Sequence, residues 1–189
     1  MDRGDGAPVK LSATKPIEAA KPALVRGLGA RFARSLPSSA EIFAGGILWA
    51  IAMATSATVG ILLLDWETSA KIETVAVLYA LGGALSFPVG LFVARLLALG
   101  RSAEVAFAAA FLSLAMATVA ITGLIFAFDY RTYYAEWHAD TGSITWVFQL
   151  VFTTLAALYQ FAVLGVRLLF PIGFVALFAA SIWFARMPR

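Results

Sequence analysis

The sequence predicts an all-α, polytopic integral membrane protein: a bundle of five transmembrane helices, with four as the alternative. Of its 189 residues, 61% are hydrophobic and 13% are charged, which is about half the charged share of a soluble domain. Several stretches of about twenty residues, the length that crosses hydrocarbon, carry almost no charge. Cysteine is absent and histidine occurs once. These features exclude a soluble enzyme, a nucleic-acid-binding module, a disulfide scaffold and a thiolate metal centre.

Residues 1–39 form a basic tail that precedes the apolar region. Seven lysines and arginines against three acids leave this tail a net charge of +4. We expect roughly its first twenty residues to be disordered, because they hold too few large apolar side chains to offset the entropy of ordering. Residues 25–36 place apolar side chains at helical spacing, which predicts a short basic amphipathic helix on anionic lipid headgroups. The basic side chains of that helix are Arg26, Arg31 and Arg34.

Residues 40–189 are expected to form the transmembrane bundle, and they begin with three stretches of the length of a span. The expected spans are Ala40–Leu64, Thr74–Leu99 and Val105–Phe128. Small residues recur at steps of four on their faces, for example Gly82, Ser86 and Gly90 in the second span. Burial of apolar surface does not drive helices together in lipid, whereas small residues let two backbones approach closely. We therefore expect tight packing among these first three helices.

The last apolar stretch, Ile144–Phe184, is 41 residues long. One straight helix of that length would reach about 60 Å, twice the thickness of the hydrocarbon layer. We therefore expect the chain to fold back near Arg167–Pro171, because proline suits the first turn of a new helix and arginine can reach the headgroups. Folding back creates a fifth span, Phe170–Phe184. In the alternative, the end of the chain is tilted or re-entrant and the bundle has four spans.

Lysine and arginine are unevenly distributed between the two sides of the expected bundle. The tail and the turn that holds Arg101 share one side, whereas Lys71 and Arg131 each stand alone among acids on the other. Cytoplasmic segments carry the excess of basic residues, so we expect the N-terminus in the cytoplasm. Four spans would also place Arg186 and Arg189 there, which favours the alternative count. We expect the inner (cytoplasmic) membrane of a bacterium, with the mitochondrial inner membrane as the alternative.

The fourth span is the one that carries a sustained line of polar side chains. The line consists of Gln149, Thr153, Gln160 and Arg167, which share one helical face. Amides in hydrocarbon need hydrogen-bond partners, so this face predicts either the lining of a polar pathway or a seam that binds a neighbouring helix. No carboxylate lies in the middle of a span, which argues against ion-coupled transport by this chain alone. Arg95 lies near the cytoplasmic end of its span, where we expect it to reach the lipid headgroups.

The polar loop at residues 129–143 combines aromatic and ionisable side chains. If helical, it gathers four aromatic rings on one side and forms an interfacial helix, a surface that also suits a protein partner. These rings belong to Tyr130, Tyr133, Tyr134 and Trp137. Glu136, His138 and Asp140 are spaced by two and do not share a helical face, so no metal site is expected. No cofactor is expected either, the alternative being a haem or chlorin ligated axially by His138.

The expected function follows from the lack of catalytic and phosphate-binding motifs in the sequence. The chain shows no glycine-rich phosphate loop, no catalytic triad pattern and no paired carboxylates within a span. We therefore expect a non-enzymatic integral membrane subunit or scaffold of a larger membrane complex, with membrane lipids and other membrane subunits or copies of itself as partners, and without nucleic acid. One alternative is a small oligomeric channel or transporter lined by the polar face of the fourth span. The other is a pigment- or lipid-binding membrane protein that uses the outer loop.

Overall fold

The computed structural model describes residues 29–64 and 68–187, and every regular element in those ranges is helical. The chain divides into two compact units, residues 1–34 and residues 35–189. In the first unit, residues 29–34 are helical and exposed. They include Arg31 and Arg34 of the expected amphipathic helix, whereas Arg26 and the expected disordered segment lie outside the described residues. The binding of that helix to lipid headgroups stays a prediction.

Four helical stretches of the second unit are long and apolar enough to span a membrane. The first three are α2 (Ser39–Leu64), α3 (Ser69–Ala98) and α4 (Ala103–Tyr134). The fourth stretch, Ile144–Leu169, consists of α5 (Ile144–Gln160), a π-helical turn η2 (Phe161–Gly165) and a 3-10 turn η3 (Val166–Leu169). A shorter apolar helix, α6 (Ile172–Ala185), follows. The prediction of an all-α membrane bundle is therefore confirmed, whereas a fifth span of full length is not.

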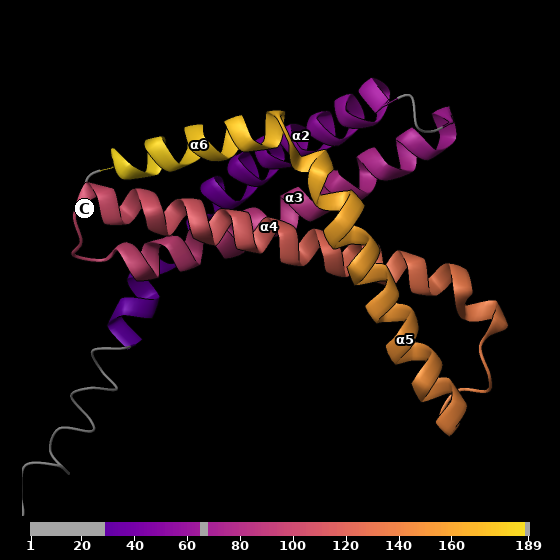
Figure 1. Cartoon of the computed structure of the whole chain (residues 1–189). Helices are drawn as coiled ribbons and strands as arrows, with labels where there is room; N and C mark the ends of the chain where they lie inside the picture. Colours follow the sequence, from indigo (N-terminus) through magenta and orange to yellow (C-terminus); the bar gives the residue numbers. More distant parts are fainter. Residues whose placement is uncertain (1–28, 65–67, 188–189) are drawn as a thin grey trace, which may run out of the picture. The chain divides into compact units, whose positions relative to one another are not determined.

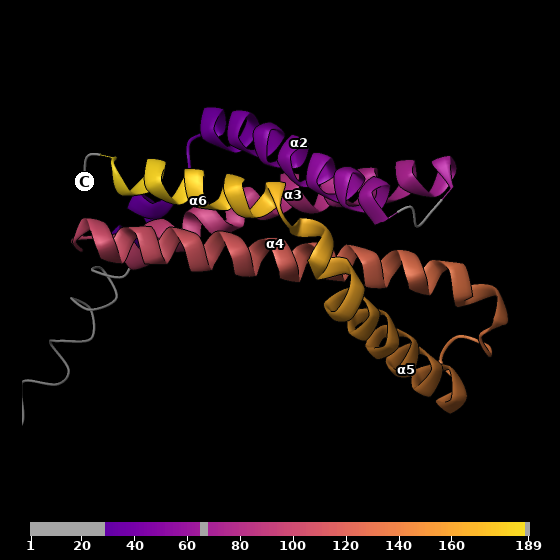
Figure 2. The ribbon, with the colours of Figure 1, turned by 45° about the horizontal axis from the view of Figure 1, so that its top comes forward.

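Helices α2, α3 and α4 pack side by side, each antiparallel to the next (Figures 1 and 2). Small residues permit this close approach. A Cβ atom on Gly82 of α3 would lie 2.2 Å from the hydroxyl oxygen of Thr122 on α4, and a Cβ atom on Gly90 would lie 2.8 Å from Leu114. The expected tight packing among the first three helices is present at the glycines that predicted it.

A buried polar contact also joins these three helices. The indole N–H of Trp49 on α2 donates to the hydroxyl of Thr118 on α4 at 3.0 Å, and the hydroxyl of Ser86 on α3 lies 3.2 Å from the same oxygen. Ser86 also donates to the backbone carbonyl of Gly83 at 3.0 Å. Hydrogen bonds of this kind between helices contribute about 0.6 kcal/mol each in membrane proteins, so they orient the helices more than they stabilise them.

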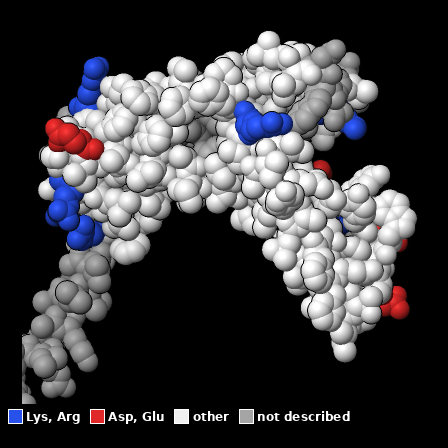
Figure 3. Space-filling model, viewed as in Figure 1, with Lys and Arg blue, Asp and Glu red and all other residues white. Residues whose placement is uncertain are grey.

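The bundle has two ends that differ in composition. At the basic end, α2 begins, α3 ends with Arg95 in its last turn, and α4 begins after Arg101. At the aromatic end, α4 ends and residues 135–143 connect it to α5. Figure 3 shows largely uncharged surface between the two ends, interrupted by one basic (blue) side chain. Such a surface suits hydrocarbon, where charged side chains are costly.

Helix α4 continues past the expected end of the third span. We placed that end at Phe128, but α4 runs to Tyr134 and a 3-10 turn, η1 (Ala135–Trp137), extends it. With 32 residues, α4 is about 48 Å long, well beyond the hydrocarbon thickness. Charged residues end a membrane span without ending the helix, because arginine and glutamate are good helix formers in water. The expected interfacial helix is therefore an extension of α4 and not a separate element.

The predicted break near Arg167–Pro171 is present, but the chain does not fold back there. In α6 the ring of Phe174 lies 6.1 Å from that of Phe111 on α4, and the ring of Phe178 lies 5.3 Å from that of Phe107. Helix α6 therefore runs antiparallel to α4, and it ends at the basic end (Figure 1). The fold-back is unnecessary because α5 lies oblique to the other helices (Figures 1 and 2), so that the long apolar stretch follows a bent path.

The direction of α6 predicts the side of the membrane on which the chain ends. Because the chain has no cysteine, single cysteines report sidedness directly. Arg186→Cys and Arg101→Cys should react with a membrane-impermeant thiol reagent from one side of sealed vesicles, and Asp140→Cys from the other. Permeabilised vesicles supply the control for reactivity. Labelling of Arg186→Cys together with Asp140→Cys would restore the fifth span.

Two threonines one turn apart on α4 should respond differently to the same substitution. Thr118 binds Trp49, whereas the buried hydroxyl of Thr122 has no partner among the described residues. Thr118→Val should lower the free energy of unfolding by about 1 kcal/mol, and Thr122→Val should leave it unchanged or raise it, because only the first loses a hydrogen bond. Unfolding in detergent, followed by circular dichroism, measures both. Equal losses in the two variants would contradict the assignment.

Candidate functional site at the helix break

The break between α5 and α6 lies against α2 and α3. A Cβ atom on Gly60 of α2 would lie 3.1 Å from the side chain of Leu168 in η3. The π and 3-10 turns replace regular helical hydrogen bonds, and Pro171 has no backbone N–H group. Hydrocarbon offers no hydrogen bonds to the groups that such a break releases, so the protein has to supply them.

Side chains of α3 and α2 satisfy the backbone on the two sides of the break. The hydroxyl of Tyr79 donates to the carbonyl of Gly165 at 2.6 Å. The backbone N–H of Gly173, in the first turn of α6, donates to the hydroxyl of Ser56 at 3.1 Å. Tyr79 is 2% exposed and Ser56 is fully buried. Helix α3 thus holds the end of the π turn, and α2 holds the beginning of α6.

A cavity of about 200 Å³ lies beside the break, and we call it the break cavity. Three aromatic side chains line it: Tyr79 of α3, Phe126 of α4 and Phe161 of η2. Its polar lining consists of Asp129, Gln160 and Thr74, and its remaining walls are Ile61, Val75, Leu78, Leu164, Gly165 and Leu168. The cavity therefore combines a largely carbon interior with one carboxylate.

The aromatic walls of the break cavity are held by close packing. The ring centroid of Phe161 lies 6.3 Å from that of Tyr79 and 5.9 Å from that of Phe126. Phe161 also fits between two glycines, since a Cβ atom on Gly123 would lie 2.9 Å from its ring and one on Gly165 would lie 2.4 Å away. The π turn and these glycines therefore set the position of the ring.

Asp129 also lines a depression at the aromatic end, which adjoins the break cavity. The depression has a volume of about 390 Å³, and Glu73 and Thr74 of α3 line it as well. Within the described part of the chain, neither Asp129 nor Glu73 has a hydrogen-bond or ion-pair partner for its carboxylate. Two acids that no described residue pairs therefore lie at the approach to an aromatic cavity.

The polar face of α5 contacts the loop and the end of α4. The carbonyl oxygen of Gln149 accepts from the backbone N–H of Ala139 at 2.8 Å, and the hydroxyl of Thr153 lies 3.3 Å from Nε2 of His138. The amide of Gln160 donates to the hydroxyl of Tyr130 at 3.4 Å. These contacts are of the kind expected of a polar seam, and the choice between a seam and a polar pathway stays a prediction.

Arg167 lies beyond α5, in η3, after the π turn. Its place on the polar face of α5 stays a prediction. We also expected Arg167 near the basic-end headgroups, but its neighbour Leu168 packs against Gly60, close to the aromatic end of α2. The reason is the path of the chain. The chain passes the break and continues to the basic end, whereas a fold-back would have placed the break at the basic end.

The four aromatic side chains expected to share one side do contact one another. The ring of Tyr134 lies 4.7 Å from that of Tyr130, 5.1 Å from that of Tyr133 and 5.9 Å from that of Trp137. Tyr133 and Trp137 are 68% and 62% exposed. Rings of this kind favour the membrane–water interface, and their role in docking a partner stays a prediction.

His138 lies in the loop after η1, and its Nε2 faces Thr153 as described above. Among the described residues, no group of three or more histidine, aspartate and glutamate side chains is placed to hold a metal ion. Axial ligation of a haem or chlorin by His138 would need Nε2 to leave Thr153 or Nδ1 to serve instead. That alternative stays a prediction.

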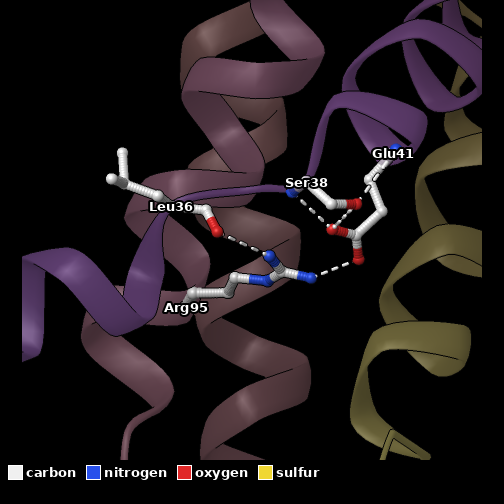
Figure 4. Close-up of polar contacts among 4 residues, drawn as sticks. All are labelled: Leu36, Ser38, Glu41 and Arg95. Carbon is white, nitrogen blue, oxygen red and sulfur yellow. Dashed lines mark hydrogen bonds and ion pairs between the residues drawn. The ribbon is translucent and has the colours of Figure 1, made fainter.

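Arg95 binds protein groups at the basic end (Figure 4). One of its nitrogens, Nη1, donates to the backbone carbonyl of Leu36 at 3.2 Å, and Nη2 pairs with the carboxylate of Glu41. Glu41 also accepts from the backbone N–H and the hydroxyl of Ser38, both at 2.8 Å, which forms a capping box at the start of α2. Arg95 therefore joins the end of α3 to the start of α2. The expected binding of lipid headgroups by Arg95 stays a prediction and would use its remaining N–H groups.

No protein family, curated protein or solved structure matches the chain in sequence or fold comparisons. The function is therefore inferred from the geometry of this molecule.

Sequence reasoning missed the residues that support the break. Ser56 and Tyr79 are single polar groups within apolar spans, and such groups usually have a partner in another helix. Their presence indicates a partner without identifying it. Asp129 was assigned to the end of a span, although a carboxylate one turn beyond Phe126 could have been recognised as a neighbour of the aromatic walls.

The hydrogen bond from Tyr79 should be measurable as stability. Tyr79→Phe removes one hydroxyl and the hydrogen bond that it donates to the Gly165 carbonyl, so we expect a loss of about 1 kcal/mol in the free energy of unfolding. Tyr159→Phe is the matched control, because Tyr159 is 70% exposed. Chemical unfolding in detergent compares the two variants. Equal stability would show that the break does not depend on Tyr79.

Proposed function

We propose that the chain is a non-catalytic integral membrane subunit or scaffold of a larger membrane assembly, in the inner membrane of a bacterium. The observation that carries this proposal is the poor coverage of the fourth apolar stretch, Ile144–Leu169, by the rest of the chain. Of its most apolar window, 11% is buried, compared with 28%, 44% and 33% for α2, α3 and α4.

The uncovered face of α5 is continuous and apolar. Ile144, Phe148, Val151, Phe152, Leu155 and Tyr159 follow at helical steps, and each is between 47% and 78% exposed. The opposite face of α5 is the polar one, which binds the loop and α4. The first half of α5 diverges from α4 (Figures 1 and 2). A helix anchored at one end and on its polar face is suited to packing between this chain and another membrane helix.

The channel or transporter alternative has one observation in its favour. Broken helices beside polar cavities are typical of transporters, and the break cavity adjoins such a break. Against it, the polar face of α5 is occupied by the loop, as described above. The pigment alternative would use His138, which already contacts Thr153. The subunit proposal therefore has the better support.

Photocrosslinking in native membranes tests the proposal. A photoreactive amino acid at Phe152 on α5 should give protein adducts of defined mass, identified as one or a few membrane proteins. Leu112 on α4, which is 60% exposed, is the matched control position and should give lipid adducts.

Two results would contradict the subunit proposal. One is lipid adducts alone at both positions. The other is purification in mild detergent as a particle that holds this chain and nothing else.

A further inference from the structure

We infer that the break cavity binds a small alkylammonium cation, an organic ligand with a primary or secondary ammonium group, which enters from the aromatic end. This inference is independent of the proposed subunit role. It depends on the charge at the mouth of the cavity, the aromatic walls of its interior and one hydrogen-bond acceptor that no described residue uses.

The charge at the mouth selects cations. Asp129 lines both the break cavity and the depression outside it, and Glu73 lines the depression. Neither carboxylate is paired within the described residues. No basic side chain lines either space, although Arg167 is next to Leu168 in sequence. Two carboxylates with one approach repel anions and raise the local concentration of cations.

The interior favours an organic cation. The rings of Tyr79, Phe126 and Phe161 line it, and an ammonium group beside such rings gains cation–π attraction. Calcium or magnesium needs six or more oxygen ligands, whereas the polar lining of the cavity comes from three side chains. Aliphatic walls suit the alkyl part of the ligand in the same way.

A free acceptor favours an ammonium group that has N–H bonds. The amide nitrogen of Gln160 donates to Tyr130, and its carbonyl oxygen accepts no hydrogen bond from the described residues. This oxygen and the carboxylate of Asp129 line the same cavity and can each accept one N–H bond from the ligand. A quaternary ammonium ion has no N–H to donate. A cavity of about 200 Å³ limits the ligand to a few carbon atoms, because drug-sized ligands occupy sites of about 300 Å³ or more.

Binding of n-butylammonium to the purified full-length protein in detergent, measured by calorimetry or by saturation-transfer NMR, tests the inference. n-Butanol and butyrate are the neutral and anionic ligands of the same carbon length, and tetramethylammonium lacks the N–H groups. We expect saturable binding of butylammonium, weaker binding of tetramethylammonium, and none of butanol or butyrate.

Variants locate the site. Asp129→Asn should weaken the binding of butylammonium about tenfold, because it removes the charge and keeps the shape. Phe126→Leu should weaken it severalfold, because it keeps an apolar wall and removes the ring. Glu136→Gln and Phe128→Leu are matched controls at exposed positions of the same region that line neither space. Circular dichroism and gel filtration verify that each variant is folded.

Three outcomes would overturn the inference. The first is no saturable binding of butylammonium by the folded wild-type protein. The second is binding of butanol as tight as that of butylammonium. The third is binding that Asp129→Asn and Phe126→Leu change no more than their controls do.

Discussion

The whole second half of the chain depends on satisfying the backbone where α5 gives way to α6. A helix can be broken inside hydrocarbon only if the protein replaces the hydrogen bonds that the break removes. Tyr79 supplies a donor to Gly165, and Ser56 supplies an acceptor for Gly173. Because these side chains come from α3 and α2, the break has a defined place beside the three-helix core, and α6 can continue along α4 to the basic end.

The same break accounts for the position of α5. With its inner end held at the π turn, α5 needs no close packing along its length, and its polar face is covered by the loop and by Tyr130. The polar residues of α5 find hydrogen-bond partners within the chain, while its apolar face stays exposed. Both features follow from the oblique position of the helix.

The two ends of the bundle treat their charged side chains differently. At the basic end, Ser38 and Glu41 cap α2, and Arg95 neutralises the capping carboxylate while it also binds Leu36. This pair connects two helix ends and leaves little net charge near hydrocarbon. At the aromatic end, Asp129 and Glu73 have no comparable partner among the described residues. That asymmetry is why the aromatic end, and not the basic end, holds the candidate site.

The amino-acid order alone determined the membrane environment, the all-helical fold, the positions of the first three spans and the place of the break. It did so because hydrocarbon thickness and the scarcity of charge act on local stretches of chain. It also predicted that Gln149, Thr153 and Gln160 share a face that needs partners.

Only the tertiary structure decided that α6 continues past Pro171 to the basic end, that α4 extends to Tyr134, and that Tyr79, Phe126, Phe161 and Asp129 surround one cavity. These outcomes depend on which distant groups can reach a released carbonyl or an unpaired amide. A one-dimensional pattern shows that a polar group needs a partner, but the distances between helices decide which partner it finds.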